Sequence, residues 1–449
     1  MATVILGGGI IGLSIAYHFS ELKPDLAASH QIHVVDSASE LLLSASGYAG
    51  GFLAKDWFSP ASASLGELSF NLHKELAATH DGARKWGYAP SKVYSLAIDS
   101  RGMGKQAKDE DWLQSGTSRS GVAPSSADGA TGPGAGADRH EMVNDDGSPA
   151  WFTRQRNGTL EVLDDEGNCA QVEPRQLCQW LIERCKERGV QIHTGCVACS
   201  IFKNAEGKVA GIKVRKDMEI YEKHAKNIVL AAGAWTPKVF QSIFHDSKFR
   251  IPVTPLAGYS IVVRSPRLTK PILDLSQHSG GTPVGISHAI YCNPSPNWAF
   301  APEAFSRLSA DGKPEIWIGG LNDPGLQLPD TANGAASLRD KNKSEEMRKA
   351  MVAMTGLSRQ GDNLQVDDLE TKREGLCFRP ISRSGYPIIS KVPANALGKD
   401  IEMEEDGGVF VATGHGPWGI SLSLGTGLVM AELLIGRKPS ADISRLAIR

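Results

Sequence analysis

The sequence has almost no net charge and no long apolar run, and each absence excludes a class of protein. The 48 lysines and arginines nearly balance the 50 aspartates and glutamates, which leaves a formal net charge of -2. A basic surface for nucleic acid is therefore not expected. No stretch approaches the roughly 20 consecutive apolar residues of a transmembrane helix, so we expect no membrane-spanning segment either.

Cysteine is also sparse and irregularly placed. The seven cysteines are odd in number, which argues against a disulfide framework and favours a reducing compartment. Cys196 and Cys199 form a CxxC pair, but no second pair or histidine cluster accompanies them, so no metal site is expected. The N-terminus lacks the basic start of a signal peptide, and we expect a cytoplasmic protein.

What the sequence does contain indicates two domains and one unusual stretch. A chain of 449 residues exceeds the size of an ordinary single core. Residues 103–149 are rich in Gly, Ser, Ala and Asp and have almost no apolar period. Such a composition cannot bury enough surface to offset its ordering entropy, so we predict a surface insertion or disordered loop there.

The first forty residues predict a β-α-β unit. Residues 3–6 form a short apolar run typical of a buried strand, and residues 10–19 have the apolar period of a helix. Residues 31–35 predict a second strand, which ends at Asp36. This order is typical of the start of a parallel sheet covered by helices.

The turn between the first strand and the helix is GGGIIG, a GxGxxG motif formed by Gly7, Gly9 and Gly12. The first glycine permits a tight turn, the second lets the backbone approach a pyrophosphate, and the third lets the helix pack close to the strand. Asp36 follows Gly12 by 24 residues, where an acid can bind the ribose hydroxyls of FAD or NAD. The motif therefore predicts a site for a dinucleotide with an unphosphorylated ribose.

Two more clusters of small residues lie far along the chain. They are NIVLAAGAWTP, residues 227–237, and ATGHGPWGISLSLGTG, residues 412–427. Their distance from the first motif indicates a long ligand enclosed by separate segments, which favours FAD over NAD. Between about 251 and 320, strand-like runs separated by turn residues predict a mainly antiparallel sheet in a second domain.

The motifs LGGGIIG, ASGYAGG, LAAGAWTP, LCFRP and GHGPWGIS occur in an order that resembles the D-amino-acid oxidase superfamily. That family includes glycine oxidase and sarcosine oxidase, which use FAD to oxidise C–N bonds. The segments GGFLAKDW, LSFNLHKELA and KWGY resemble a fungal branch of FAD oxidoreductases. One member of that branch is linked to endosomal trafficking, so an endosomal association is a second expectation for location.

The resemblance implies an α/β (α+β) fold with two parts. A Rossmann-type FAD-binding domain would comprise residues 1–58, 165–250 and 405–449. A mainly antiparallel-sheet substrate domain would comprise residues 59–164 and 251–404, with 103–149 as a disordered insertion. The positions that match FAD-binding residues of the family are Gly7, Gly9, Ile11, Gly12, Asp36, Ser46, Gly50, Gly51, Val197, Ala232, Gly233, Gly416, Trp418, Gly419 and Ile420.

The same resemblance implies a set of residues at the reacting end of the cofactor. Arg379 matches the arginine that binds the substrate carboxylate, and a guanidinium suits that role because it pairs bidentately; an ion pair at a domain junction is the alternative. Tyr291 matches a substrate-facing tyrosine, although a core tyrosine is equally consistent. Trp418 lies in the GHG loop near both cofactor and substrate.

Cys377 stands where sarcosine-oxidase-like relatives attach the flavin through a thioether. The Arg-Pro that follows it two residues later matches the noncovalent, glycine-oxidase-like pattern. We therefore expect noncovalent FAD and a buried, inert thiol, with covalent attachment as the alternative.

Two tryptophans depart from the sarcosine oxidase pattern. Trp317 and Trp418 stand where those enzymes place lysines, of which the first assists the reaction with oxygen and the second helps to hold the carboxylate. O2 is therefore an open choice as electron acceptor, and a bulkier, more aromatic substrate region is expected. His288 and His415 are the nearest candidate bases, but the reaction needs no strong base.

The function that these observations favour is oxidation of an amino acid or N-substituted amine. Hydride transfer from the carbon that bears a neutral amine to the flavin would give an imine. A flavin-binding regulatory or trafficking protein with little turnover is the alternative, favoured by the insertion and the fungal resemblance. An NAD-dependent dehydrogenase would explain only the first motif.

Overall fold

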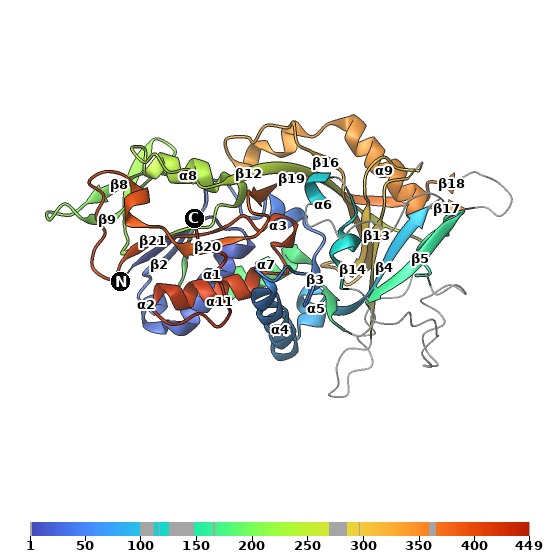
Figure 1. The fold of residues 1–449 in the computed structure, drawn as a ribbon, viewed down its shortest axis with the longest axis horizontal. Helices are drawn as coiled ribbons and strands as arrows, with labels where there is room; N and C mark the ends of the chain where they lie inside the picture. Colours follow the sequence, from blue (N-terminus) through green and yellow to red (C-terminus); the bar gives the residue numbers. More distant parts are fainter. Residues whose placement is uncertain are drawn as a thin grey trace.

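The computed structural model describes residues 2–98, 112–115, 117–124, 148–164, 167–268, 285–295, 297–358 and 365–448. Two sheets lie next to each other along the longest dimension of the molecule, and both chain termini lie on the side of the first sheet (Figure 1). The predicted fold class, a dinucleotide-binding sheet with a second sheet domain, is confirmed.

The first sheet contains the predicted β-α-β unit. Its strand order is β20-β21-β11-β1-β2-β7, and all its pairs are parallel except β20 with β21. Strands β1 and β11 are buried along their whole length, as expected for a parallel sheet covered on both faces. The bounds are β1 Thr3–Leu6, β2 Ile32–Val35, β7 Gln191–His193, β11 Asn227–Leu230, β20 Ile388–Lys391 and β21 Gly408–Thr413.

Helices cover one face of this sheet and a small antiparallel sheet covers the other. Gly427 lets two helices approach closely, because a Cβ there would lie 2.6 Å from the backbone of Ser14. The elements of the helical face are α1 Ile10–Leu22, α4 Ala63–His80, α7 Pro174–Glu187 and α11 Ser423–Leu434. Those of the opposite face are β8 Cys196–Lys203, β9 Val209–Lys216, β10 Glu219–His224 and α8 Thr236–Ile243.

The second sheet is antiparallel except for one parallel pair, β13 with β4. Its order is β16-β12-β15-β14-β13-β4-β6-β3, with β19 paired to β12 and β5 paired to β4. Helix α9 (Lys341–Thr355) packs against it. The strands are β3 Phe52–Ala54, β4 Ala89–Ile98, β5 Gly158–Asp164, β6 Cys169–Gln171, β12 Val253–Arg264, β13 Ser287–Cys292, β14 Glu303–Leu308, β15 Pro314–Gly319, β16 Asn322–Asp323 and β19 Glu370–Ser382.

Three elements belong to a different sheet region from the one that the predicted domain boundaries assign to them. Helix α4, from the segment 59–164, packs in the core of the first sheet. Strand β20, from 251–404, pairs with β21 in the first sheet, whereas β3, from 1–58, pairs with β6 in the second. The chain crosses between the two sheets more often than changes in composition reveal.

The stretch 103–149 is in part folded, contrary to the prediction of a disordered insertion. Trp112–Ser115 form a short helix, α6, and Arg119–Val122 form a 3-10 turn, η1. Trp112 and Arg119 are buried, because ring and ion-pair contacts that composition does not reveal hold them. Residues 103–111, 116 and 125–147 lie outside the described part of the chain.

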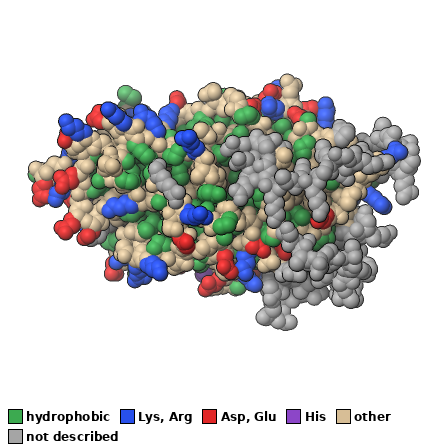
Figure 2. Space-filling view, in the orientation of Figure 1, with side chains coloured by type: hydrophobic (Ala, Val, Ile, Leu, Met, Phe, Trp, Pro, Cys, Tyr) green, Lys and Arg blue, Asp and Glu red, His purple; other side chains and the backbone are tan. Residues whose placement is uncertain are grey.

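The surface agrees with the balanced composition. Lysines, arginines, aspartates and glutamates are interspersed over the face seen in Figure 2, without a large area of one sign. Within the described ranges, no helix combines the length and the apolar character needed to cross a membrane.

Candidate active site

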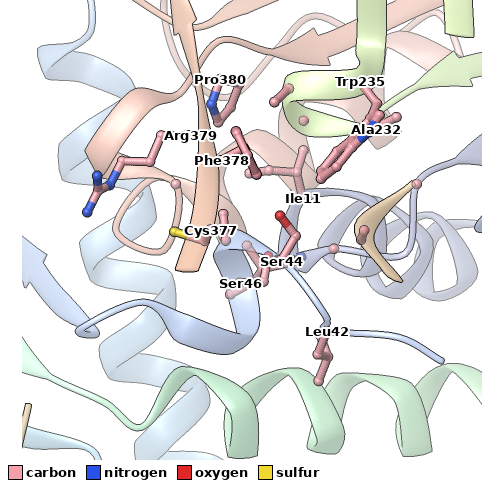
Figure 3. Close-up of a pocket in the computed structure, with 18 of the residues that line it drawn as sticks. Ile11, Leu42, Ser44, Ser46, Ala232, Trp235, Cys377, Phe378, Arg379 and Pro380 are labelled. Atoms are coloured by element: carbon pink, nitrogen blue, oxygen red, sulfur yellow. Dashed lines mark hydrogen bonds between the residues drawn. The ribbon is translucent and has the colours of Figure 1, made fainter. Parts of the chain in front are cut away.

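A long cavity runs from the glycine-rich turn of the first sheet to the buried face of the second. It contains about 1930 Å³ of space free of protein atoms, a figure that includes the openings to solvent. The segments around it come from β1, β2, β8, β12, β14, β15, β19, the turn after β11 and the loop before α11. Figure 3 shows how Ile11, Ser46, Ala232 and Cys377 converge from separate elements on this space.

The glycine-rich turn forms the end of the cavity at the first sheet. Gly7 has a φ of 117°, a conformation that favours glycine. A Cβ on Gly12 would lie 1.9 Å from the carbonyl oxygen of Gly7, so no larger residue fits there. Gly12 therefore supports the turn from behind, while Gly7, Gly9 and Ile11 border the cavity.

Helix α1 begins at this turn and presents its N-terminus to the cavity. Gly9 is its N-cap and supplies no side chain, so backbone N–H groups of the first turn remain for a ligand. Oγ of Ser46 accepts one of them, the N–H of Ile10, at 2.9 Å. The predicted position Ser46 thus borders the cavity and orders the helix end.

Asp36 is fixed at the end of β2 by two backbone hydrogen bonds. Its carboxylate accepts the N–H of Gly8 at 2.7 Å and that of Ala38 at 2.8 Å. A carboxylate has about four acceptor positions, so it can still accept hydroxyl donors from the cavity that it borders. This arrangement suits a ribose.

Small residues line the wall that follows. Val197 lies at the start of β8, and Ala232 and Gly233 follow the end of β11; all three border the cavity. Gly233 has a φ of 54°, and a Cβ there would meet no atom within 4 Å. The space in front of this wall is therefore open to a flat ligand.

Gly50 and Gly51 border the cavity too, but contacts within the protein already require them. A Cβ on Gly50 would lie 2.6 Å from the Phe305 ring, and one on Gly51 would lie 2.0 Å from the carbonyl oxygen of Val172. Arg307, which sequence reasoning did not single out, donates to the carbonyls of Ala49 and Gly50 at 3.1 and 3.2 Å. This segment is thus held from behind by a buried arginine.

The loop before α11 supplies Gly416, Gly419 and Ile420 to the cavity lining. His415 also borders it, and Nε2 of His415 lies 3.0 Å from Oγ1 of Thr426. Burial lowers the pKa of His415 to about 3, so this histidine is neutral near pH 7. It orders the loop rather than providing charge.

Arg379 borders the opposite end of the cavity, on β19. Its Nη1 donates to Oδ1 of Asn322 at 2.7 Å, and among the described residues it forms no ion pair. Gly258 on the neighbouring strand makes room for it, because a Cβ there would lie 1.9 Å from Nη1. Arg379 and Phe378 extend to opposite sides of β19 (Figure 3). A half-buried guanidinium with an amide as its partner can still take up an anion.

Cys377 lies on the same side of β19 as Arg379 (Figure 3). The thiol borders the cavity and is 6% exposed. Burial raises its pKa, so the protonated, weakly nucleophilic form prevails.

Two aromatic candidates occupy different positions. Trp317 borders the cavity, stacks on Phe305 with ring centroids 5.1 Å apart, and donates from Nε1 to the carbonyl of Tyr48 at 3.0 Å. Tyr291 is fully buried behind Phe305 and does not border the cavity. Its placement is that of a core tyrosine, and burial raises its pKa.

Trp418 and His288 also lie off the cavity lining. Trp418 packs edge to face on Phe58 at 5.0 Å, so its ring forms part of the loop's packing. His288 is buried within β13, where burial lowers its pKa to about 4. Neither residue is placed to exchange a proton with a molecule in the cavity.

Sequence reasoning missed an ion pair on the cavity wall. Nη2 of Arg119 lies 2.9 Å from Oε2 of Glu303, and both side chains border the cavity. Arg119 belongs to the stretch that composition predicted to be disordered. Trp112, a lone aromatic residue in that stretch, was the available signal that part of it is packed.

Comparisons with known proteins bear on the family and the fold. Residues 2–433 match the family model DAO, described as FAD dependent oxidoreductase. A Schizosaccharomyces pombe protein named only as an oxidoreductase is 26% identical over 457 residues, covering 99% of this chain and 96% of its own.

Solved structures show the same fold. Glycine oxidase from Geobacillus kaustophilus has a TM-score of 0.63 at 17% identity, covering 100% of this chain and 98% of its own. L-amino acid deaminase from Proteus myxofaciens, in complex with anthranilate, has a TM-score of 0.63 at 16% identity, covering 99% and 92%.

Proposed function

Since the chain belongs to the DAO family of FAD-dependent oxidoreductases, we propose that it oxidises the C–N bond of an amino acid or N-substituted amine to an imine. The observation that carries this proposal is Arg379. It borders the same cavity as the glycine-rich turn, and among the described residues no carboxylate pairs with it. An amino-acid carboxylate would supply the missing partner.

The chain's residues fit FAD at the other end. The close approach of Gly12 to Gly7 and the N-terminus of α1 suit a pyrophosphate, with Gly9 and Ile11 on the lining. Asp36 would hold the adenosine ribose. When bound, FAD supplies the acceptor for the hydride that leaves the carbon bearing the amine.

The remaining cofactor positions would lie along the body of FAD. A flat ring system requires small side chains or bare backbone for close approach. The remaining cofactor positions that border the cavity are Ser46, Gly50, Gly51, Val197, Ala232, Gly233, Gly416, Gly419 and Ile420.

Arg379 would orient the substrate rather than activate it. Asn322 holds Nη1 at 2.7 Å, which fixes the guanidinium while its other N–H groups remain for a carboxylate. Fixing the carboxylate positions the neighbouring carbon and amine, and such positioning can account for much of a rate enhancement.

Neither candidate histidine is placed as a strong base. His415 is neutral and engaged with Thr426, and His288 lies away from the lining. The substrate would therefore react with its amine already neutral, and activity would rise with pH as the amine loses its proton. Water would then hydrolyse the released imine to a carbonyl compound and an amine.

Anaerobic mixing of the purified holoprotein with primary and N-methyl amino acids of both configurations tests this proposal. We expect at least one to bleach the flavin absorbance and to yield the carbonyl product. A flavin that stays oxidised across the whole panel would contradict it and would favour a flavin-binding role without turnover. Peroxide release in air would establish whether O2 is an acceptor.

A further inference from the structure

A buried ion pair borders the cavity and is not used by the proposed reaction. Arg119, from η1, is 7% exposed, and Glu303, at the start of β14, is 6% exposed. Nη2 of Arg119 donates to Oε2 of Glu303 at 2.9 Å. The pair joins residues 184 positions apart and places both charges on the cavity wall.

Aromatic rings surround the arginine. Its guanidinium carbon lies 4.9 Å from the ring centroid of Trp112, 4.7 Å from that of Trp418 and 5.6 Å from that of Tyr291. Rings that lie over the face of a guanidinium leave hydrogen bonding to its edge. Among the described residues, Nε of Arg119 has no hydrogen-bond partner.

The energetics indicate that the pair serves more than stability. Desolvation of two charges offsets much of their attraction, so an apolar replacement of a buried ion pair is often neutral or stabilising. A buried N–H without an acceptor adds a further cost. Both residues nevertheless border the cavity, where a ligand can contact the pair.

The charges indicate which ligand group fits. The Arg119–Glu303 pair is neutral as a unit, whereas the charge of Arg379 is unbalanced by any described acid. A second carboxylate at the pair would be repelled by Glu303, and an ammonium group would be repelled by Arg119. An uncharged group with both a donor and an acceptor satisfies both residues.

We propose that Arg119 and Glu303 form a specificity subsite for a substrate side chain that is uncharged and both donates and accepts hydrogen bonds, as a carboxamide does. The proposal rests on the function proposed above, in which Arg379 takes the substrate carboxylate. Trp112 and Trp418 hold Arg119 in place as positioning residues.

A series of free amino acids of similar size tests the subsite in the wild-type holoprotein. Glutamine is compared with glutamate, lysine and leucine, and asparagine with aspartate, in the configuration that reduces the flavin. The measured quantity is the rate constant of anaerobic flavin reduction divided by the dissociation constant. We expect the carboxamides to exceed their counterparts by about tenfold or more. Equal values for leucine and glutamine would overturn the proposal.

Charge-changing variants give a result that a purely structural pair would not. Glu303→Gln leaves Arg119 unbalanced and should move the preference toward glutamate by about tenfold. Arg119→Gln leaves Glu303 unbalanced and should move it toward lysine. The matched control is Arg188→Gln, because Arg188 also pairs with a glutamate at 2.7 Å and lies over a tyrosine ring, away from the cavity.

Flavin content shows whether each variant has folded. If the Arg119→Gln variant does not retain FAD, the Glu303→Gln variant and the wild-type substrate series still test the subsite. If no amino acid binds to or reduces the protein with its full content of FAD, the proposed function fails and the subsite fails with it. If amino acids react but the charge changes leave the preference unaltered, only the subsite is overturned.

Discussion

The two ends of the cavity differ in the residues that line them. At the first sheet, the lining includes glycines at which a side chain would collide with backbone; a Cβ on Gly7, for example, would lie 2.4 Å from the carbonyl oxygen of Ala231. At the second sheet, the lining is formed by side chains such as Arg379, Glu303 and Trp317. The first end therefore depends on glycines that lack side chains, and the second end depends on the side chains that line it.

This difference teaches how each end tolerates change. Where a glycine is in close contact with backbone, as at Gly7, an added side chain would collide, so this part of the site tolerates little change. A side-chain-built site can be altered one residue at a time without disturbing the sheet that carries it. The same fold can therefore keep its cofactor while its substrate changes.

The largest expected effect is a steric change at the first end. Gly12→Val would place a side chain within 1.9 Å of the Gly7 carbonyl oxygen, so we expect FAD binding to be abolished and the free energy of unfolding to fall by roughly 1–3 kcal/mol. Flavin content and urea unfolding measure both. Gly325→Ala is the control, since its nearest contact would be 3.5 Å away. Normal flavin content in Gly12→Val would contradict the comparison.

Removal of a charge at the second end should weaken substrate binding without affecting FAD binding. Arg379→Met removes the carboxylate partner, and we expect the dissociation constant of the substrate to rise by about 100-fold, or ~3 kcal/mol. FAD content should remain that of the wild type. Arg383→Met, an exposed neighbour, serves as control. A loss of FAD with unchanged substrate binding would reverse the assignment of the ends.

Low pH should destabilise both sheet regions, because each buries a histidine whose pKa is lowered. The pKa of His415 is lowered to about 3 and that of His288 to about 4, in each case by burial. Below pH 6.5 the unfolded chain takes up protons that the folded chain does not, so stability should fall as pH falls from 6.5 toward 4.

The variant His288→Gln measures this effect. It should reduce the slope of stability against pH in that window by up to about 1.4 kcal/mol per pH unit. Urea unfolding of the apoprotein at several pH values measures the slope. The exposed His245 provides the control His245→Gln, for which no change is expected. An unchanged slope in His288→Gln would show that this histidine is protonated in the folded protein.

The smallest effect is expected at Cys377. Because burial raises the pKa of its thiol, we expect no bond to the flavin, and acid precipitation of the wild type should release all flavin into the supernatant. Cys377→Ala should retain FAD to the same extent. Flavin that stays with the precipitated wild type but not with the variant would contradict this prediction.

The sequence predicts the first end well because its determinants are local. The strand, the turn and the helix that surround Gly7 and Gly12 follow one another directly, and each has its own apolar period. Asp36 ends the next strand, so its position relative to the turn follows from one β-α-β unit. Distant positions such as Ala232 and Gly416 required the family resemblance, since no local pattern places them at the same cavity.

The arrangement of the second end depends on long-range contacts that cannot be predicted from a single sequence. Nothing near Arg119 indicates that it meets Glu303, 184 positions away, and its polar surroundings predict disorder. Tyr291 and Trp418 matched family positions, but packing places both off the cavity lining. Side-chain orientation depends on the neighbours that tertiary structure brings together, so residue type alone left these positions open.

A crystal structure of the holoprotein with a nonreactive carboxylate ligand tests the account most directly. We predict FAD with its pyrophosphate at the turn from Gly7 to Gly12 and its ribose at Asp36, and the ligand carboxylate paired with Arg379 in the same cavity. A carboxylate bound elsewhere, with Arg379 still held only by Asn322, would contradict the assignment of the substrate end.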